Sequence, residues 1–275
     1  MFQNRWTRRN NYGATYKLYK GVLYFTIITQ KNMKKFLVIG NPIDHSLSPK
    51  LHNYWIKKNK IDATYDKKLL NKSDIDSIIL KVKNEEITGV NVTVPFKKTV
   101  ISFLDELTIE AKESQSVNTI YKKNNRIVGH NTDIAGFELG LRHCKYNVSG
   151  KKVFILGAGG VVSSIILALK RMGVSKIILT NRTKQKAHDM KKSFSGIEII
   201  DWGKIVEFDM IINATSVGLK KDDEFELNYT DLGSNKFFYD VIYNPKETNF
   251  LKKAKREGNQ IENGKMMFIY QAHQA

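Results

Sequence analysis

Within residues 153–186, a continuous apolar run is followed by apolar residues at helical spacing. Val153–Leu156 is a short apolar run of the kind that forms a buried parallel strand. A glycine-rich turn follows, and Ser163–Met172 then has helical spacing. Lys176–Leu179 is a second apolar run. The pattern predicts a strand, turn, helix and strand of the dinucleotide-binding type.

The glycines of this turn have different physical roles. Gly157 allows the sharp turn out of the strand, and Gly159 lets the backbone come close to a pyrophosphate. The N-terminus of the next helix offers free N–H groups and the positive end of the helix dipole to that anion. A glycine turn alone is weak evidence for a nucleotide site, because glycine also follows strands for structural reasons.

The end of the second strand is basic where NAD-binding proteins usually carry an acidic residue. The chain reads Thr180-Asn181-Arg182-Thr183-Lys184. An aspartate or glutamate would hold the ribose 2′-hydroxyl of NAD, whereas the planar guanidinium of Arg182 suits a 2′-phosphate. This pattern favours NADP over NAD. The alternative is a solvated basic loop in a basic protein.

Strand and helix patterns alternate from Met33 onward. In residues 33–146 we predict strands at 36–40, 63–69, 89–94, 118–122 and 126–129, with helices at 50–58, from a cap at 71–74 to 82, within 99–114, and at 133–143. Further along we predict strands at 197–200, 210–213, 237–241 and 260–262, with helices at 184–193, 248–257 and 266–274. Ser48 is a predicted N-cap before Pro49, and Asn124-Asn125 is a predicted hairpin turn. This alternation predicts an α/β protein whose first domain has a mainly parallel sheet.

Polar residues stand at the carboxyl ends of several predicted strands in the first domain. Ligands bind at this edge of an open α/β sheet, so we expect these groups to converge on a small, oxygen-rich anion. Each residue alone also fits a cap, a turn or a surface position, and only their joint placement favours a site. The residues are Ser46, Ser48, Thr93, Lys97, Asn118, Asn131, Thr132 and Asp133.

Composition narrows the class of protein. The 275 residues are 41% hydrophobic, and the formal net charge is +18. The lysines are spread along the chain without an aromatic-interleaved motif, so attraction of anionic substrates explains them better than nucleic-acid binding. Cys144 is the one cysteine, which excludes an intrachain disulfide and favours a reducing compartment. The six histidines have no metal-ligand spacing, so we predict no metal site. No apolar run is long enough to span a membrane, so we predict that the protein does not bind to a membrane.

Residues 1–32 differ from the rest of the chain. They contain six basic residues and no acidic one, and Gly21–Thr29 is apolar, which resembles a signal or transit peptide. No convincing small-residue cleavage site follows. Because Met33 directly precedes the first clear strand, we predict a disordered or misassigned extension that ends at residue 32.

Beyond these patterns, the chain resembles the shikimate dehydrogenase family from Phe36 to Gln271. The stretches that carry the resemblance are GNPIDHSLSPKLHN at 40–53, GVNVTVPFK at 89–97, SVNT at 116–119, GHNTDIAGF at 129–137, GAGG at 157–160, NRT at 181–183, INATSVG at 212–218, YDVIYNPKET at 239–248 and GKMMFIYQA at 264–272. Their order over two domains makes the match specific.

The resemblance implies NADPH-dependent reduction of 3-dehydroshikimate to shikimate, on the route to chorismate and aromatic amino acids. We also expect a cytoplasmic protein that is a monomer or a homodimer. The resemblance also implies a substrate domain at 33–132, a Rossmann-like NADP domain at 133–247, and a segment at about 248–275 that packs back on the first domain.

The resemblance assigns roles to residues of this chain. Lys97 and Asp133 match the catalytic pair. The substrate residues it implies are Ser46 and Ser48 with Tyr243 for the carboxylate, and Thr93, Asn118, Asp133 and Gln271 for the hydroxyls. The cofactor residues it implies are Gly157, Ala158, Gly159, Gly160, Val161, Asn181, Arg182, Thr183, Lys184, Gln185, Lys186, Val241 and Gly264.

The chemistry of the pair agrees with this assignment. A ketone oxygen gains negative charge during reduction, and Lys97 can donate a hydrogen bond or a proton to it while Asp133 orients the lysine. Two alternatives stay open. One is a quinate/shikimate dehydrogenase with relaxed cofactor use, against which Arg182 argues. The other is a non-catalytic nucleotide-binding paralogue, against which the retention of both Lys97 and Asp133 argues.

The chain departs from the family pattern at three places. Ser116 stands where a small residue, often alanine, is usual. Val161-Val162 replaces two alanines after the glycine turn. Lys265-Met266 follows Gly264 where Leu-Gly is common, and family members normally extend beyond the position of Ala275. We expect this last departure to affect stability and the position of Gln271 more than the chemistry.

Overall fold

The computed structural model describes residues 7–9, 14–19, 22–27, 33–220, 222–227 and 229–275. It divides into two compact units, residues 1–34 and residues 35–275. The first unit contains β1 (Thr7–Arg9), β2 (Ala14–Tyr19) and β3 (Val22–Ile27) in one antiparallel sheet. The prediction for residues 1–32 falls in part outside the described residues (1–6, 10–13, 20–21 and 28–32) and stays a prediction.

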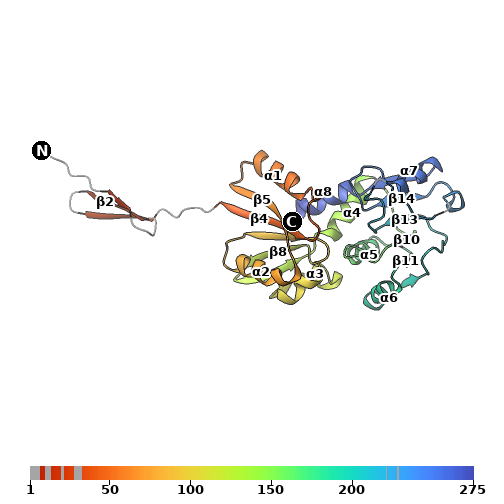
Figure 1. Ribbon diagram of the computed structural model, residues 1–275, viewed down its shortest axis with the longest axis horizontal. Coiled ribbons are helices and arrows are strands. Elements are labelled where there is room, and N and C mark those ends of the chain that lie inside the picture. The colour runs from red at the N-terminus through yellow and green to blue at the C-terminus, as the bar shows by residue number, and fades with distance from the viewer. Residues whose placement is uncertain (1–6, 10–13, 20–21, 28–32, 221, 228) are drawn as a thin grey trace. The chain divides into compact units, whose positions relative to one another are not determined.

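Residues 35–275 carry two sheets of six strands each (Figure 1). The first has the strand order β5-β4-β6-β8-β9-β7 and is mixed: β4 and β6 are parallel, as are β7 and β9, whereas β8 is antiparallel to both neighbours. Its strands are β4 (Lys34–Gly40), β5 (Ala63–Leu69), β6 (Gly89–Val92), β7 (Glu106–Leu107), β8 (Thr119–Lys123) and β9 (Arg126–His130). Its helices are α1 (Ser48–Lys58), α2 (Ile75–Lys83) and α3 (Ile109–Ser114), with 3-10 turns at Lys72–Asp74 and Thr99–Phe103.

Local sequence explains the turns of this domain. Asn124 and Asn125 both have positive φ, as the turn of the hairpin between β8 and β9 requires, so that prediction is confirmed. Asn71 and Asp74 form a capping box before α2, also as predicted. The short strand β7 was not predicted, because two residues are too few to show an alternating pattern.

The second sheet is parallel throughout, in the order β12-β11-β10-β13-β14-β15. The first strand along the chain, β10, lies at the centre and the order reverses beside it, which is the dinucleotide-binding arrangement. The strands are β10 (Lys152–Leu156), β11 (Lys176–Thr180), β12 (Ile197–Ile199), β13 (Met210–Asn213), β14 (Phe237–Asp240) and β15 (Gln260–Asn263). The helices are α4 (Asp133–His143), α5 (Val162–Arg171), α6 (Lys184–Ser193), α7 (Asn249–Arg256) and α8 (Lys265–Gln274), with a 3-10 turn at Thr230–Leu232.

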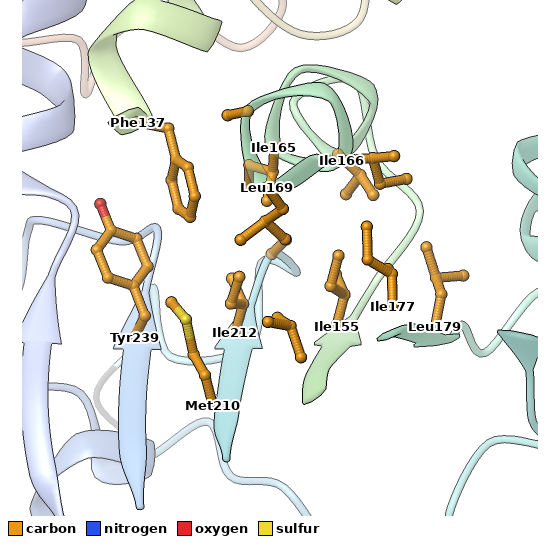
Figure 2. Packing of buried hydrophobic residues seen from close by; sticks show 14 of the residues in the cluster. Phe137, Ile155, Ile165, Ile166, Leu169, Ile177, Leu179, Met210, Ile212 and Tyr239 are labelled. Atoms are coloured by element: carbon orange, nitrogen blue, oxygen red, sulfur yellow. The ribbon is translucent and has the colours of Figure 1, made fainter. Parts of the chain in front are cut away.

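Both faces of this sheet are buried, which is why its strands read as continuous apolar runs. Val153 and Ile155 of β10 face the helices α4, α5 and α6, while Phe154 and Leu156 face α7 and the aromatic residues around it. Figure 2 shows the first of these layers, in which Ile155 lies among side chains of α5 and the neighbouring strands. Period-two alternation therefore divides one strand between two cores.

The helix α8 packs along α4 at close range. A Cβ placed on Gly136 of α4 would lie 2.6 Å from Cβ of Gln271 and 2.9 Å from the carbonyl oxygen of Met267. Only a residue without a side chain allows this approach. The segment 248–275 was predicted to pack back on the first domain. By contrast, β15 is a strand of the second sheet and α7 packs against that sheet. Within this segment, only α8 can therefore meet the prediction. Of the helices in the described part of the chain, none is both long and apolar enough to cross a membrane.

Candidate active site

A buried ion pair joins Lys97 to Asp133. The Lys97 Nζ and Asp133 Oδ2 atoms lie 2.6 Å apart, and the two side chains are only 11% and 6% exposed. Lys97 lies in the segment that follows β6, two residues after Pro95, and Asp133 is the first residue of α4. The backbone N–H of Val117 donates to the Lys97 carbonyl oxygen at 2.8 Å, which fixes the start of the lysine side chain. The pair presents one cation and one carboxylate in a water-poor site, where each stabilises the charge of the other.

Asn118 extends this pair into a network. Its Nδ2 atom lies 3.1 Å from Asp133 Oδ1, 2.8 Å from Thr132 Oγ1 and 3.3 Å from Gln271 Oε1. Its Oδ1 atom accepts from the backbone N–H of Thr132 at 2.9 Å. The amide therefore holds the carboxylate from one side while Lys97 holds it from the other. Gln271 reaches this point from α8, far along the chain.

Asn131 holds the first turn of α4 in place. Its Oδ1 accepts from the backbone N–H groups of Asp133 at 3.0 Å and Ile134 at 3.3 Å. These are two of the four N–H groups that a helix leaves without internal partners. Asp133 is thus free of a capping role, and its carboxylate faces Lys97 and Asn118 instead.

The loop before α1 brings Ser46 and Ser48 together, and it corrects one prediction. Ser48 was predicted as the N-cap, but α1 already includes Ser48, and Leu47 takes the cap position without a side-chain hydrogen bond among the described residues. The backbone N–H of Ser48 donates instead to Ser46 Oγ at 3.4 Å. Pro49 lies in the first turn, as predicted.

Tyr65 and Asn91 connect this loop to the network, and the sequence did not indicate either of them. The Tyr65 hydroxyl donates to Asn91 Oδ1 at 2.6 Å, and Asn91 Nδ2 donates to the Asn118 carbonyl oxygen at 3.1 Å. Burial raises the pKa of Tyr65, and a hydrogen bond from Ser48 partly offsets this rise. The ring of His52 stacks on Tyr65 at 4.1 Å, and burial lowers the pKa of this histidine to about 4. The available signal was a polar Asn91 within an otherwise apolar buried strand.

Tyr243 reaches the same loop from the second domain. Its ring stacks on Phe268 of α8 with the ring centroids 4.5 Å apart. Burial raises the pKa of Tyr243, and a backbone hydrogen bond from Leu47 partly offsets the rise. Leu47 lies between the two serines, so the tyrosine approaches the part of the site predicted to hold a carboxylate. Thr93 is half-buried just beyond β6, four residues before Lys97.

The glycine turn lies at the switch point between β10 and β13. Gly157 has φ +111°, and a Cβ there would lie 2.8 Å from the Ala214 carbonyl oxygen. A Cβ on Gly159 would meet only that same oxygen, at 3.8 Å, so the turn stays open to a ligand. The helix α5 begins without a side-chain cap among the described residues, and its first turn carries no acidic residue. Its N–H groups are therefore placed to receive an anion.

The basic segment after β11 divides into two parts. Arg182 is exposed, and no carboxylate of the described residues lies within ion-pair distance of it. Lys184 Nζ, by contrast, pairs with Asp201 Oδ1 at 2.9 Å, and Gln185 Nε2 donates to Asp189. The side chain of Asn181 accepts from the backbone N–H of Ala158 at 3.0 Å and so supports the glycine turn. Lys186 and Thr183 are exposed at the start of α6.

Val241 and Gly264, both predicted to contact the cofactor, lie against each other. Gly264 stands directly over the Val241 carbonyl group, where a Cβ would collide with it. A glycine at this position lets the start of α8 contact the end of β14. Among the described residues, no three His, Cys, Asp or Glu side chains gather as a metal site would need.

Asp240 is a buried carboxylate that joins three segments beside the predicted cofactor site. Its Oδ2 accepts from Thr248 Oγ1 at 2.6 Å, and its Oδ1 accepts from Asn213 Nδ2 at 3.0 Å and from the backbone N–H of Ile242 at 2.9 Å. Burial raises the pKa of Asp240 to about 6 in spite of these bonds. The group therefore holds a proton more readily in the folded state than in the unfolded chain.

We predict that Asp240→Asn flattens the pH dependence of stability between pH 4 and 6. A raised folded-state pKa makes the folded state bind more protons in this range, so its contribution favours folding at low pH and is lost as the pH rises through about 6. The asparagine mimics the neutral acid and can donate to Thr248. The free energy of unfolding is measured with urea at pH 4 and at pH 6. Its change between these two pH values should differ by roughly 1–3 kcal/mol between the unchanged protein and Asp240→Asn. Equal pH slopes for both proteins would contradict this role of Asp240.

Comparison with known proteins agrees with these features. A family model described as the shikimate dehydrogenase substrate binding domain matches residues 38–120, and one described as shikimate / quinate 5-dehydrogenase matches residues 138–230. The chain is 64% identical over 242 residues to the NADP-dependent shikimate dehydrogenase of Pelagibacter ubique, which covers 88% of this chain and 91% of that protein.

Solved structures lead to the same family. Shikimate dehydrogenase from Aquifex aeolicus superposes with a TM-score of 0.82 at 36% identity, over 88% of this chain and 90% of that one. The Thermus thermophilus enzyme, solved in complex with NADP(H) and shikimate, superposes with a TM-score of 0.80 at 29% identity, over 87% of this chain and 90% of that one. The chain belongs to the NADP-dependent shikimate dehydrogenase family.

Proposed function

We propose that this protein catalyses the NADPH-dependent reduction of 3-dehydroshikimate to shikimate, a step on the route to aromatic amino acids. The observation that carries the proposal is the buried Lys97–Asp133 pair, which lies against the glycine turn. A Cβ on Gly160 would be 3.9 Å from Cδ of Lys97. The proton donor and the proposed cofactor site are therefore neighbours.

Lys97 has the central part in the proposed mechanism. The ketone oxygen of the substrate gains negative charge as its carbon is reduced, and the Lys97 ammonium donates a hydrogen bond and then a proton to that oxygen. Asp133 holds the ammonium at 2.6 Å and orients it. Asn118 fixes the second oxygen of Asp133, so the carboxylate cannot turn away from the lysine.

The remaining residues bind and orient the substrate. Ser46 and Ser48, with Tyr243 beside them, are proposed to hold its carboxylate. Hydroxyl and amide groups recognise the alcohols of the ring through paired hydrogen bonds, which reject analogues that lack them. The residues proposed for this role are Thr93, Asn118, Asp133 and Gln271.

The groups around the glycine turn of the second sheet are chemically suited to bind NADPH. The open Gly159, the uncapped start of α5 and the exposed Arg182 match a pyrophosphate and a 2′-phosphate in the chemistry of their donors. Asn181 and Ala158 hold the turn itself, and Val241 and Gly264 border the proposed nicotinamide side. NADPH, when bound, supplies the hydride for the reduction.

We also propose that domain boundaries lie at residues 132 and 247. The proposed location of the protein is the cytoplasm. Cys144 is the one cysteine of the chain, so no intrachain disulfide can form, which supports a reducing compartment. A monomer or a homodimer that binds neither nucleic acid nor membranes is proposed, and sedimentation with added DNA or vesicles would test this.

Loss of NADPH absorbance with 3-dehydroshikimate as substrate tests the activity. Rapid turnover with NADPH and slow turnover with NADH is the expected result. Quinate and shikimate, each with NADP⁺, are the paired substrates for the reverse reaction. Folded protein that binds NADPH but turns over none of these substrates would defeat the proposal and favour a non-catalytic paralogue.

A further inference from the structure

The hydroxyl of Ser116 connects the first domain to the glycine turn of the second. Ser116 Oγ donates to the carbonyl oxygen of Gly160 at 3.2 Å. The serine is fully buried, so this hydroxyl has no access to bulk water. An alanine at this position would leave the Gly160 carbonyl without the bond.

The direction of this hydroxyl is fixed by the segment that also fixes Lys97. The Ser116 carbonyl oxygen accepts from Ser114 Oγ at 3.1 Å and from Asn131 Nδ2 at 2.8 Å. The next residue, Val117, donates its N–H to the Lys97 carbonyl oxygen at 2.8 Å. Ser116 and the catalytic lysine are thus parts of one rigid unit.

Gly160 presents both of its faces to this unit. Its carbonyl group points to Ser116, and its Cα side lies against the aliphatic stem of Lys97, where a Cβ would be 3.9–4.0 Å from the lysine carbons. The N–H groups that follow begin α5 and are the ones placed to receive an anion. A movement of Gly160 would therefore shift the anion site and the lysine contact together.

Two further contacts bridge the domains along α5. Asn131 Nδ2 donates to Ser164 Oγ at 2.9 Å, and Arg171 Nη2 lies 3.0 Å from Glu113 Oε2. These contacts join the first domain to the helix, whereas the Ser116 bond joins the first domain to the turn. Loss of the Ser116 hydroxyl should therefore loosen the turn while the domains stay joined.

We propose that Ser116 is a positioning residue that holds the cofactor-binding turn against the Lys97 segment, so that the turn is already formed before NADPH binds. The inference rests on the proposed function only in the choice of NADPH as the ligand. A preorganised turn binds its anion more tightly, because less ordering is required on binding.

The test compares Ser116→Ala with Thr108→Val. Each variant loses one hydrogen-bonded hydroxyl of the first domain. The Thr108 hydroxyl bonds to His130 Nδ1 at 2.8 Å and accepts from the Ala111 N–H at 3.4 Å, so its loss touches neither Ser116 nor the glycine turn. Loss of one hydrogen bond corresponds to a change of about 2- to 13-fold in an equilibrium constant. We expect Ser116→Ala to raise the Kd of NADPH by about this factor in a fluorescence titration without substrate, and Thr108→Val to leave it unchanged.

Hydrogen exchange gives a second readout that does not depend on activity. In the protein without ligand, the amides of residues 157–162 should exchange faster in Ser116→Ala than in Thr108→Val. Ser116→Cys, which keeps a weak donor, should fall between Ser116→Ala and the unchanged protein in both measurements. In turnover, the KM for NADPH should rise while the KM for 3-dehydroshikimate stays within about twofold, since the substrate contacts are untouched.

An unchanged Kd and unchanged exchange in a folded Ser116→Ala protein would overturn the inference. Equal effects of Ser116→Ala and Thr108→Val would also overturn it, because they would show a general loss of stability. Unmodified protein that binds NADPH without reducing 3-dehydroshikimate would count against the proposed function alone.

Discussion

Replacing Lys97 with methionine is expected to lower kcat for 3-dehydroshikimate by about 10²- to 10⁴-fold, the usual contribution of a positioned proton donor. Methionine keeps the apolar stem that lies against Gly160 and removes only the ammonium. The charge that develops on the ketone oxygen then has no cation within reach. The Kd of NADPH, measured without substrate, should change little, because the glycine turn and Arg182 remain.

Lys98→Met is the matched control, since Lys98 is the next residue and is exposed. It should leave kcat unchanged. Lys97→Met leaves the Asp133 carboxylate buried without its cation, which costs stability. The double variant Lys97→Met/Asp133→Asn removes both charges and should restore stability without restoring turnover. Near-normal turnover in folded Lys97→Met would show that another group donates the proton.

Replacing Arg182 with alanine is expected to raise the KM for NADPH by about 10- to 100-fold and to leave the KM for NADH almost unchanged. Hydrogen bonds to a charged group contribute about 1.5–3 kcal/mol, and the 2′-phosphate is the part of NADPH that NADH lacks. Arg182 is exposed, so its removal leaves no buried charge behind. The ratio of kcat/KM for the two cofactors should therefore fall by one to two orders of magnitude.

Lys192→Ala controls for the general positive field. It removes one charge from the last turn of α6, whereas Arg182 lies just before the first turn. A field effect would lower NADPH binding similarly in both variants and would depend strongly on salt. A contact with the 2′-phosphate predicts a large effect for Arg182 alone. Equal KM changes for NADPH and NADH in Arg182→Ala would contradict the assignment.

Sequence periodicity predicted elements best where local signals agreed. The helices Asp133–His143 and Lys184–Ser193 and the strand Met210–Asn213 lie where their patterns placed them. Strand direction was harder to predict, because an apolar run looks the same in a parallel and an antiparallel pair. The hairpin at Asn124-Asn125 accounts for the antiparallel pair of β8 and β9, whereas the antiparallel pairing of β8 with β6 has no local signal in the sequence.

The sequence allowed us to predict candidate site residues, but not most of the hydrogen bonds that join them. The polar residues at strand ends include Lys97, Asn118 and Asp133, which the structure joins in one hydrogen-bond network. Their roles in catalysis and binding stay predictions. The links made by Tyr65 and Asn91 could not be predicted, since they depend on which strands are neighbours. The occupied side chains of Lys184 and Gln185 likewise depend on tertiary partners that local sequence does not name.

The packing of α8 on α4 has a consequence for the order in which the protein matures. Asn118 and Gln271 are hydrogen-bonded across 153 residues of sequence, which makes this the longest-range of the side-chain bonds described around Lys97 and Asp133. During synthesis, the first sheet can form as soon as β9 has left the ribosome, whereas the Asn118 amide gains this partner only after the whole second sheet has followed. Closing so long a loop is slow, and it cannot begin before α8 is made. A nascent chain therefore carries Lys97, Asn118 and Asp133 for most of its translation without the Asn118–Gln271 hydrogen bond.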